Sequence, residues 1–317
     1  MTAPAAGAAA PWKVWTALGL VYVFWGSTYL AISYVVQTLA PLLSASLRFC
    51  VAGALMAVYL LVVRRRTPVV PVTGRQVATA AVTGVLLLLG GNGLVTLAEQ
   101  RDLPSGLTAL LTAAVPLWVV LLRAGTGDRP ERRTVLGVAL GFVGVAFLLL
   151  PGARPEGVAL LPALMVVGSG LLWSVGSFAA TRLPLPADPV LTTVVQMVAG
   201  GASLAVVGAA AGEDLSLSAG STASLVGLGY LVVFGSIVAF SAYSWLLGVA
   251  PVSVVSTYAY VNPVVAVLLG VLIAGEAVSG VTVVGGAVTV LAVAVVVSRG
   301  AVRRPRAPEV LPEGDRL

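Results

Sequence analysis

Hydrophobic residues in this chain form long uninterrupted runs, without the strict alternation of strands or the amphipathic stripe of soluble helices. A helix needs about 20 apolar residues to cross a bilayer. The 61 residues between Asp214 and Glu276 carry no charge, so we expect them to hold two spans, with a turn near Gly248 and Pro251. The pattern predicts ten membrane-spanning helices, at about residues 12–36, 42–63, 76–98, 105–122, 134–150, 158–180, 190–211, 221–247, 252–274 and 279–298.

Composition agrees with a lipid environment and narrows the classes of function. Hydrophobic residues make up 59% of the chain and charged residues 9%, against roughly 45–50% and 25% in soluble domains. His is absent and Cys50 is the single cysteine, so we expect neither a metal nor a cofactor. The net charge is +6, but the basic residues lie at the ends of apolar segments and not on one continuous face. Nucleic acid is therefore not an expected partner.

The distribution of Lys and Arg predicts the orientation in the membrane, because basic loops stay in the cytoplasm. With the N-terminus inside, 15 of the 18 basic residues lie on the cytoplasmic side. Arg101 and Arg154 fall outside, and Arg48 lies within a span. We therefore expect a multi-pass protein of the inner or plasma membrane, a monomer in the lipid bilayer, with both termini cytoplasmic. The basic tail at residues 299–317 is expected to be disordered.

The two halves of the sequence repeat each other at a nearly constant offset. Matching pairs stand 147 or 148 residues apart: Trp25 with Trp173, Gly53 with Gly201, and Pro116 with Pro263. A repeat of five spans must lie upside down relative to its copy, because an odd number of crossings reverses direction. This predicts two five-helix inverted repeats, at residues 1–150 and 151–298, with a small-molecule site near the midplane between them.

Six segments point to a known family. They are WGSTYLAI from Trp25, SLRF from Ser46, GNGLVTLAEQ from Gly91, PSGLTALLTAAVPL from Pro104, FGSIVAFSAY from Phe234 and YAYVNPVVAVLLGVLIAGE from Tyr258. With them the chain resembles the EamA-type transporters of the drug/metabolite transporter superfamily, in particular its exporter-like subgroup, over about residues 12–298. The resemblance implies ten helices in two inverted repeats and export of amino acids, metabolites or drugs.

Arg48 is the most informative single residue. An ionisable side chain inside a span costs at least about 2.5–3.5 kcal/mol on insertion scales and normally faces a partner or a water-filled cavity. We expect Arg48 to pair with an anion. This anion is either a carboxylate or phosphate of the substrate, or Glu99 in the outer half of the neighbouring helix. Asn92, Thr96 and Glu99 form one polar stripe on that helix. Either the stripe lines the pathway, with Glu99 as a proton acceptor, or Asn92 hydrogen-bonds across helices and Glu99 lies in the headgroup region.

The fourth and ninth spans carry matched prolines beside polar side chains. Because proline has no N–H, Pro116 frees the backbone carbonyl of Thr112, and Pro263 frees that of Ala259. Together with Tyr258 and Asn262, these groups predict either a polar site at the midplane or a packing kink.

Aromatic residues mark one face of the first helix. Tyr22, Trp25 and Tyr29 share this face, as expected for a wall that receives aromatic or cationic ligands and also for ordinary packing. The second-half counterparts that we include in the candidate site are Trp173, Gln196 and Tyr243, together with Ser177 and Ser236 as positions to test.

These features favour a secondary exporter that works by alternating access. The chain has no Gly-rich Walker segment, so a gradient or the substrate's own concentration must drive it. The alternative is an integral-membrane enzyme acting on a lipid-linked substrate. We do not expect an enzyme, because the sequence offers neither a cluster of metal-binding carboxylates nor a histidine pair.

Overall fold

The protein is helical throughout the part that the structure describes. In the computed structural model this part comprises residues 10–63, 71–127, 130–150, 152, 159–214, 216–250, 252–255 and 257–300. Every secondary-structure element within these residues is a helix. The all-helical fold class expected from the apolar runs is confirmed. The tail that the sequence predicts to be disordered lies outside the described residues from position 301 onward.

The helices reproduce the ten predicted spans. In the first half they are α1 (Pro11–Val35), α2 (Pro41–Val63), α3 (Gly74–Gly84), η1 (Val85–Gly93), α4 (Leu94–Glu99), α5 (Ser105–Thr112), α6 (Val115–Gly125) and α7 (Arg132–Leu149). In the second half they are α8 (Leu160–Arg182), α9 (Pro189–Ala210), η2 (Leu217–Ala219), α10 (Thr222–Tyr230), η3 (Leu231–Val238), α11 (Ala239–Val249), α12 (Val252–Val255), α13 (Tyr258–Ala274) and α14 (Gly280–Gly300). Among the described residues, eight stretches are long and apolar enough to cross a membrane, and α13 and α14 are shorter apolar helices. The total is ten.

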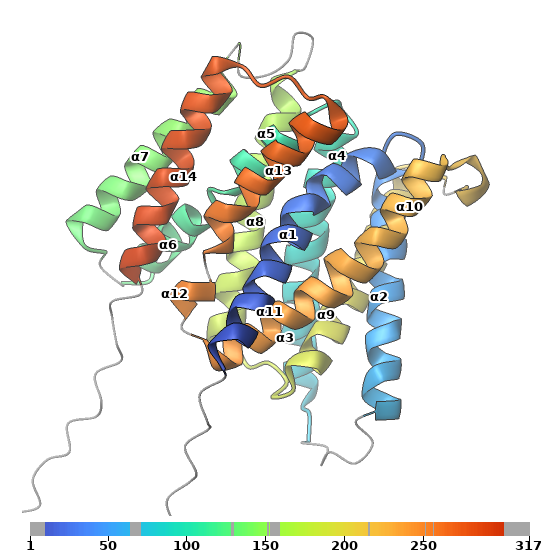
Figure 1. Ribbon diagram of the computed structural model, residues 1–317. Helices are drawn as coiled ribbons and strands as arrows, with labels where there is room; N and C mark the ends of the chain where they lie inside the picture. The colour runs from blue at the N-terminus through green and yellow to red at the C-terminus, as the bar shows by residue number, and fades with distance from the viewer. Residues whose placement is uncertain are drawn as a thin grey trace, which may run out of the picture.

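Several spans are built from more than one helical segment. The third combines α3, η1 and α4, the fourth combines α5 and α6, and the eighth combines α10, η3 and α11. The helices lie side by side in one bundle, and α1 begins at the same end at which α14 finishes (Figure 1). Large apolar side chains such as Leu136, Leu272 and Leu291 are exposed on the outside of this bundle. Such a surface is suited to lipid rather than to water.

Glycines bring α2 and α9 together in a reciprocal contact. A Cβ atom at Gly53 would lie 3.6 Å from the backbone nitrogen of Val198, and one at Gly201 would lie 3.2 Å from that of Cys50. Gly53 and Gly201 are 148 residues apart, and so are Cys50 and Val198. The two contacts are therefore copies of each other with the halves exchanged, as expected for a two-fold relationship. Small residues permit this close approach in a membrane bundle.

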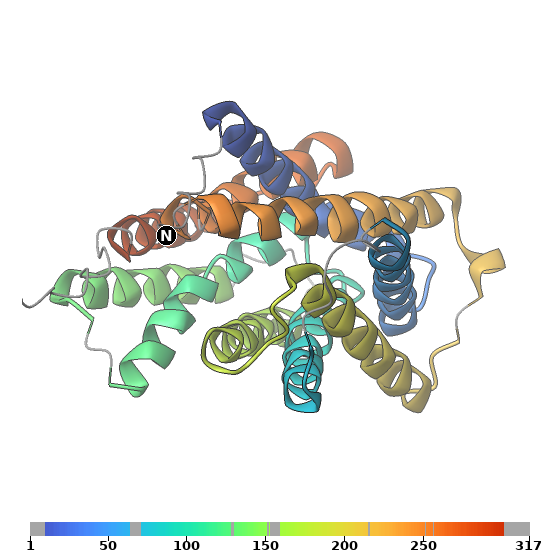
Figure 2. The ribbon, with the colours of Figure 1, turned by 90° about the horizontal axis from the view of Figure 1, so that it is seen from below.

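The pair α7 and α14 repeats the same relationship at one edge of the bundle (Figures 1 and 2). A Cβ atom at Gly137 would lie 2.9 Å from Cγ2 of Val296, and one at Gly285 would lie 3.2 Å from Cδ2 of Leu148. Both members again differ by 148 residues. In both interfaces, therefore, the contacting positions on the two helices are exchanged at the same offset of 148 residues.

A carboxylate joins the halves where α2 begins. Glu213, which follows α9, accepts hydrogen bonds from the backbone N–H groups of Leu42, at 3.0 Å, and Leu43, at 2.9 Å. These donors have no partner within their own helix, and a negative charge is favoured at a helix N-terminus.

A second carboxylate makes the equivalent bonds where α5 begins. Glu276, which follows α13, accepts from the backbone N–H groups of Ser105, at 2.7 Å, and Gly106, at 3.0 Å. In both cases a glutamate from the second half of the chain caps a helix from the first half, 170 and 171 residues away. Both helices start at the end of the bundle opposite the start of α1, and we call this the capped end.

Two π-helical segments interrupt the third and eighth spans. η1 covers Val85–Gly93 and η3 covers Leu231–Val238, so they occupy nearly equivalent positions in the two halves. The sequence predicted ordinary α-helices there. A π-helical turn carries one more residue per hydrogen-bonded turn and is frequently found at functional sites. Both segments face the centre of the bundle, where the cavity lies.

Candidate functional site

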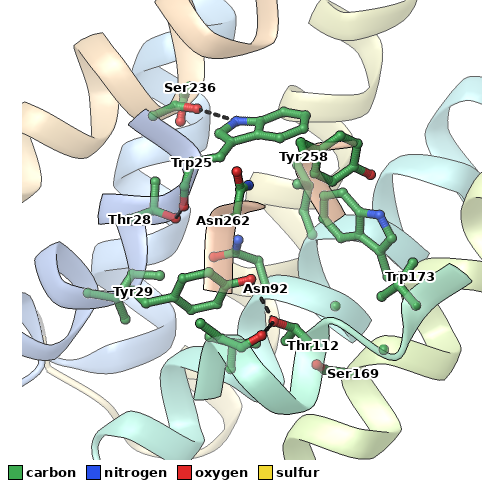
Figure 3. A pocket seen from close by; sticks show the side chains of 18 of the residues that line it. Trp25, Thr28, Tyr29, Asn92, Thr112, Ser169, Trp173, Ser236, Tyr258 and Asn262 are labelled. Atoms are coloured by element: carbon green, nitrogen blue, oxygen red, sulfur yellow. Dashed lines mark hydrogen bonds between the residues drawn. The ribbon is translucent and has the colours of Figure 1, made fainter. Parts of the chain in front are cut away.

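A cavity of about 140 Å³ opens between helices of both halves. Its walls come from α1, α2, η1, α4, α5, α6, α8, α9, η3, α11 and α13, with Ala113 from the turn between α5 and α6. One water needs only about 10–15 Å³ on this measure, so the space is large enough for a small organic molecule. Figure 3 shows its polar and aromatic side chains converging from opposite sides.

Eight of the twelve residues predicted for the site line this cavity. They are Trp25, Tyr29, Arg48, Asn92, Thr112, Trp173, Tyr258 and Asn262. They come from six separate spans, so folding brings together positions that are distant in the sequence. Ser236, named from the sequence as a position to test, also lines the cavity.

Arg48 is buried in the cavity wall with an exposed fraction of 4%. Its Nε–H donates to Oγ of Ser236 at 2.9 Å, and its guanidinium carbon lies 4.6 Å from the ring centroid of Phe49. Among the residues that the structure describes, none donates a hydrogen bond to either carboxylate oxygen of Glu99. The pair of Arg48 with Glu99, one of the two alternatives left open by the sequence, is therefore not formed. The guanidinium borders the cavity, and no carboxylate among the described residues is bonded to it.

Two amide side chains project into the cavity. Figure 3 shows Asn92, from η1, and Asn262, from α13, approaching each other across the space. The side-chain oxygens of both are buried and accept no hydrogen bond from any part of the chain that is described. Buried polar atoms are paired in the large majority of cases, because an unpaired one costs about 1–3 kcal/mol. Two unpaired acceptors at one cavity mark a place where a ligand would supply the donors.

Aromatic side chains form a structured wall around Trp25. Its indole N–H donates to the carbonyl of Gly235 in η3 at 3.1 Å, which fixes the orientation of the ring. The ring meets Tyr258 edge to face, with centroids 5.2 Å apart. Tyr243 packs behind both, at 5.0 Å from Trp25 and 5.8 Å from Tyr258, so it supports the wall and does not line the cavity. Trp173 faces the cavity from α8 (Figure 3).

Tyr29 links the first and fourth spans beside the cavity. Its hydroxyl lies 2.7 Å from Oγ1 of Thr112, and Thr112 itself donates to the carbonyl of Ala109 at 2.9 Å. A threonine hydroxyl has one proton, so Tyr29 must be the donor in the bond between them.

The matched prolines have different effects. The fourth span is interrupted between Thr112 and Val115, immediately before Pro116, as the lost N–H predicts. Pro263 instead stands inside a continuous α13, in the wall of the cavity. The fourth and ninth spans therefore differ in backbone structure at the depth of the site.

The other predicted residues lie away from the lining. Tyr22 forms a hydrogen bond with Thr257, and the side-chain nitrogen of Gln196 donates to Thr83 at 3.1 Å. Glu99 lies beyond Tyr29, toward the capped end. Sequence spacing placed these side chains on the right helices, but neighbouring helices hold them outside the cavity.

Sequence reasoning missed several lining residues, notably Thr28, Gly91 and Ser169. Thr28 stands one turn after Trp25, so the helical spacing could have found it. Gly91 borders Trp173 so closely that a Cβ atom there would lie 2.7 Å from the indole Cε3. The Gly-Gly pair before Asn92 was the only feature of the local sequence that could have indicated Gly91 as a lining residue. Ser169 had none.

Comparison with known proteins identifies the family. The EamA-like transporter family matches this chain twice, at residues 13–150 and 160–298. The chain belongs to that family. The inner membrane transporter YedA of Escherichia coli (strain K12) is 36% identical over 296 residues, covering 93% of this chain and 94% of its own. A probable amino-acid metabolite efflux pump of the same organism is 23% identical over 269 residues, 82% of this EamA-like chain and 87% of the pump.

A solved crystal structure shares the fold of this EamA-like protein. It superposes with a TM-score of 0.62 at 22% identity and covers 93% of this chain and 98% of its own. The relatives and the helical architecture together establish a multi-pass membrane transporter, as the apolar pattern predicted.

Proposed function

We propose that this protein is a secondary transporter that exports small metabolites, amino acids or drugs across the inner or plasma membrane. The observation that carries the proposal is the buried guanidinium of Arg48 at a cavity between the two halves, to which no carboxylate of the described part of the chain is bonded. A charge so placed is costly, and an anionic substrate would offset that cost. The amino-acid metabolite efflux pump among the relatives supports the direction of transport.

The lining suggests how a substrate would be held. An anionic group would accept charge-assisted hydrogen bonds from Arg48. Donor groups of the same molecule, such as an amine or an amide N–H, would reach the free oxygens of Asn92 and Asn262. An apolar portion would lie against Trp25 and Trp173, whose ring faces also attract cations. Amphipathic molecules with an acidic group satisfy all three regions.

Transport would proceed by movement of the repeats at residues 1–150 and 151–298 around this cavity. The basic residues support an orientation with both termini cytoplasmic, which puts the capped end outside. In the conformation described, Glu213 and Glu276 tie the two repeats together at that end. Release to the outside would require these caps to separate, while the two-fold contacts of α2 with α9 could act as the pivot.

Counterflow in proteoliposomes tests this function. The purified protein is reconstituted, the vesicles are loaded with unlabelled compound, and exchange with external labelled amino acids, carboxylates and cationic dyes is followed. Exchange of at least one acidic or zwitterionic compound is expected, and Arg48→Ala should abolish it. Arg101→Ala is the matched control, because Arg101 is exposed and, among the described residues, donates to the carbonyl of Leu97 on its own helix. Exchange that survives Arg48→Ala for every compound would overturn the assignment of the site.

A further inference from the structure

The guanidinium of Arg48 depends on one protein hydrogen bond for its orientation. Its Nε–H donates to Oγ of Ser236 at 2.9 Å, and Ser236 has an exposed fraction of 1%. Within the part of the chain that the structure describes, the two terminal nitrogens bond to no other residue, and neither is shut off from open space. An arginine side chain has several rotatable bonds, so the bond from Nε decides which way these nitrogens point.

Arg48 borders two spaces, the cavity and a smaller one next to it. The smaller space also borders Ser44 and Thr96 and has a volume of about 10 Å³. That is room for no more than one water. In the conformation described, an organic anion can therefore reach Arg48 from the cavity and not from the smaller space.

The neighbour of Ser236 in η3 leaves room for the guanidinium. A Cβ atom at Gly235 would lie 3.2 Å from Nη2 of Arg48, so a side chain there would crowd this nitrogen. Gly235 and Ser236 both line the cavity. With Nε bonded to the serine, the remaining donors on the two terminal nitrogens form a planar fork, which matches the two oxygens of a carboxylate.

The same two residues also hold the aromatic wall. The carbonyl of Gly235 accepts the indole N–H of Trp25 at 3.1 Å. Consecutive residues of one π-helical segment, from the second half of the chain, therefore hold two lining side chains of the first half: Trp25 from α1 and Arg48 from α2.

The internal repeat shows that the hydroxyl accompanies the positive charge. The third and eighth spans align at an offset of 145 residues, which relates Ser236 to Gly91 of η1. At 148 residues, Arg48 corresponds to Gln196 of α9, which bonds to Thr83 instead. The copy thus lacks both the hydroxyl and the guanidinium. The packing of the repeated helices alone does not require a serine at this place.

We propose that Ser236 is a positioning residue, which holds Nε of Arg48 so that the two terminal nitrogens meet the substrate anion. The inference rests on the proposed transport function and names the residue that orients its anion site. Without the hydroxyl, the Nε–H would have no acceptor in a buried place, and the guanidinium would turn to find one. The affinity for an acid would then fall although the positive charge remains.

The first test compares acids with their neutral amides. Intrinsic tryptophan fluorescence of the reconstituted protein gives the affinity for two pairs, L-leucine with L-leucinamide and benzoate with benzamide, and for any further acid that exchanges in counterflow. In Ser236→Ala the affinity for the acids should fall about tenfold, while that for the amides is retained. Ser241→Ala is the matched control, because Ser241 is exposed farther along the same span and does not line the cavity.

The second test follows the bond itself and needs no substrate. In protein with isotopically labelled arginine, nuclear magnetic resonance should show a slowly exchanging Nε–H signal that is lost in Arg48→Lys. Slow exchange is expected because this group is buried and bonded. Ser236→Ala should shift the signal and speed its exchange with water, whereas Ser241→Ala should leave it unchanged.

Each outcome has a defined meaning. Unchanged affinity for the acids in Ser236→Ala overturns the proposal. Equal losses for acids and amides also overturn it, because they indicate a general disturbance of the cavity. Where the parent binds no amide, the Nε–H signal decides: a signal that Ser236→Ala does not alter rejects the positioning role, and a shifted, faster-exchanging one supports it. Failure of every acid to exchange with the wild-type protein counts instead against the proposed transport of acidic compounds.

Discussion

The carboxylate of Glu276 lies 2.7 Å from the backbone nitrogen of Ser105, and this bond ties the end of α13 to the start of α5. The two residues belong to different halves of the chain and are 171 positions apart. The bond satisfies a helix donor that would otherwise be orphaned, and it places a negative charge where the helix dipole favours one. Any motion that separates the halves at this end must first break it.

Weakening this cap should therefore favour opening of the capped end. In Glu276→Gln the charge is lost and one of two acceptor oxygens becomes a donor, which should cost about 0.5–2 kcal/mol by analogy with other helix caps. A cysteine at Thr112, in a background with Cys50→Ser, reports on access to the cavity. External thiol reagents should label it faster in Glu276→Gln, and Glu131→Gln, an exposed position, is the control. Equal labelling rates would mean that the cap does not hold this end closed.

Arg48 should be essential, and its loss should not be rescued at Glu99. Arg48→Ala removes the only positive charge that the described residues place in the cavity wall, so transport should be abolished while the protein still inserts. Arg48→Lys should also transport poorly, because the planar fork of donors is lost. The double variant with Glu99→Gln should remain inactive in counterflow, since the two residues are not bonded. Recovery in the double variant would show instead that they pair at another stage of the cycle.

Substitutions at the adjacent residues Asn262 and Pro263 should affect different quantities, the first substrate affinity and the second turnover. Asn262→Ala removes an acceptor that is free in the cavity, so substrate affinity should fall by an amount corresponding to about 1–3 kcal/mol. Pro263→Ala restores a helical N–H in α13 and should slow turnover while leaving affinity nearly unchanged. Intrinsic tryptophan fluorescence gives affinity and counterflow gives turnover. If Asn262→Ala binds and transports as the parent does, Asn262 has only a packing role.

A single methyl group should disturb the wall at Trp173. In Gly91→Ala the added Cβ would lie 2.7 Å from the indole, so the ring must move into the cavity or the helices must separate. Lower substrate affinity and altered tryptophan fluorescence are expected. Gly168→Ala on α8 meets nothing within 4 Å and is the control. It should be neutral, or stabilise by up to about 1 kcal/mol through its higher helix propensity.

The proposed orientation is open to a direct test. A reporter enzyme that is active only in the periplasm, fused after Arg316, should give no signal, whereas the same reporter inserted after Arg101 should be active. The distribution of basic residues motivates both expectations. Activity at the C-terminal fusion would reverse the assignment of the capped end to the outside.

The sequence was sufficient for the spans because the bilayer imposes a length and a polarity that each helix must meet on its own. The start of α5 at Ser105, for example, was predicted correctly. It was also sufficient for residues on strongly marked faces, such as Trp25 and Asn262, which do line the cavity. Gln196 could not be placed in this way. Its amide was predicted to reach substrate, but the side-chain nitrogen donates a hydrogen bond to Thr83 on a neighbouring helix.

Features that depend on distant partners could not be predicted from local pattern. The π-helical segments and the glutamate caps are of this kind. Glu213 looks like an ordinary loop residue in the sequence, and only the folded chain brings it to the N–H of Leu42. A π-helical turn is likewise selected by packing against neighbours, since nothing in the local run of leucines at Leu86–Leu89 distinguishes it from an α-helix.

The placement of both caps at one end has a thermodynamic consequence. At the opposite end, the described residues join the halves through weaker bonds, such as that from Gln76 to the carbonyl of Leu185 at 3.2 Å. The inward-open and outward-open conformations of the proposed cycle would thus be unequal in free energy. An empty carrier would spend most of its time sealed toward the exterior. Its resting population would be biased toward the cytoplasmic side, where the substrate binds. The change to the outward-open conformation would be the slow step, which substrate binding must accelerate.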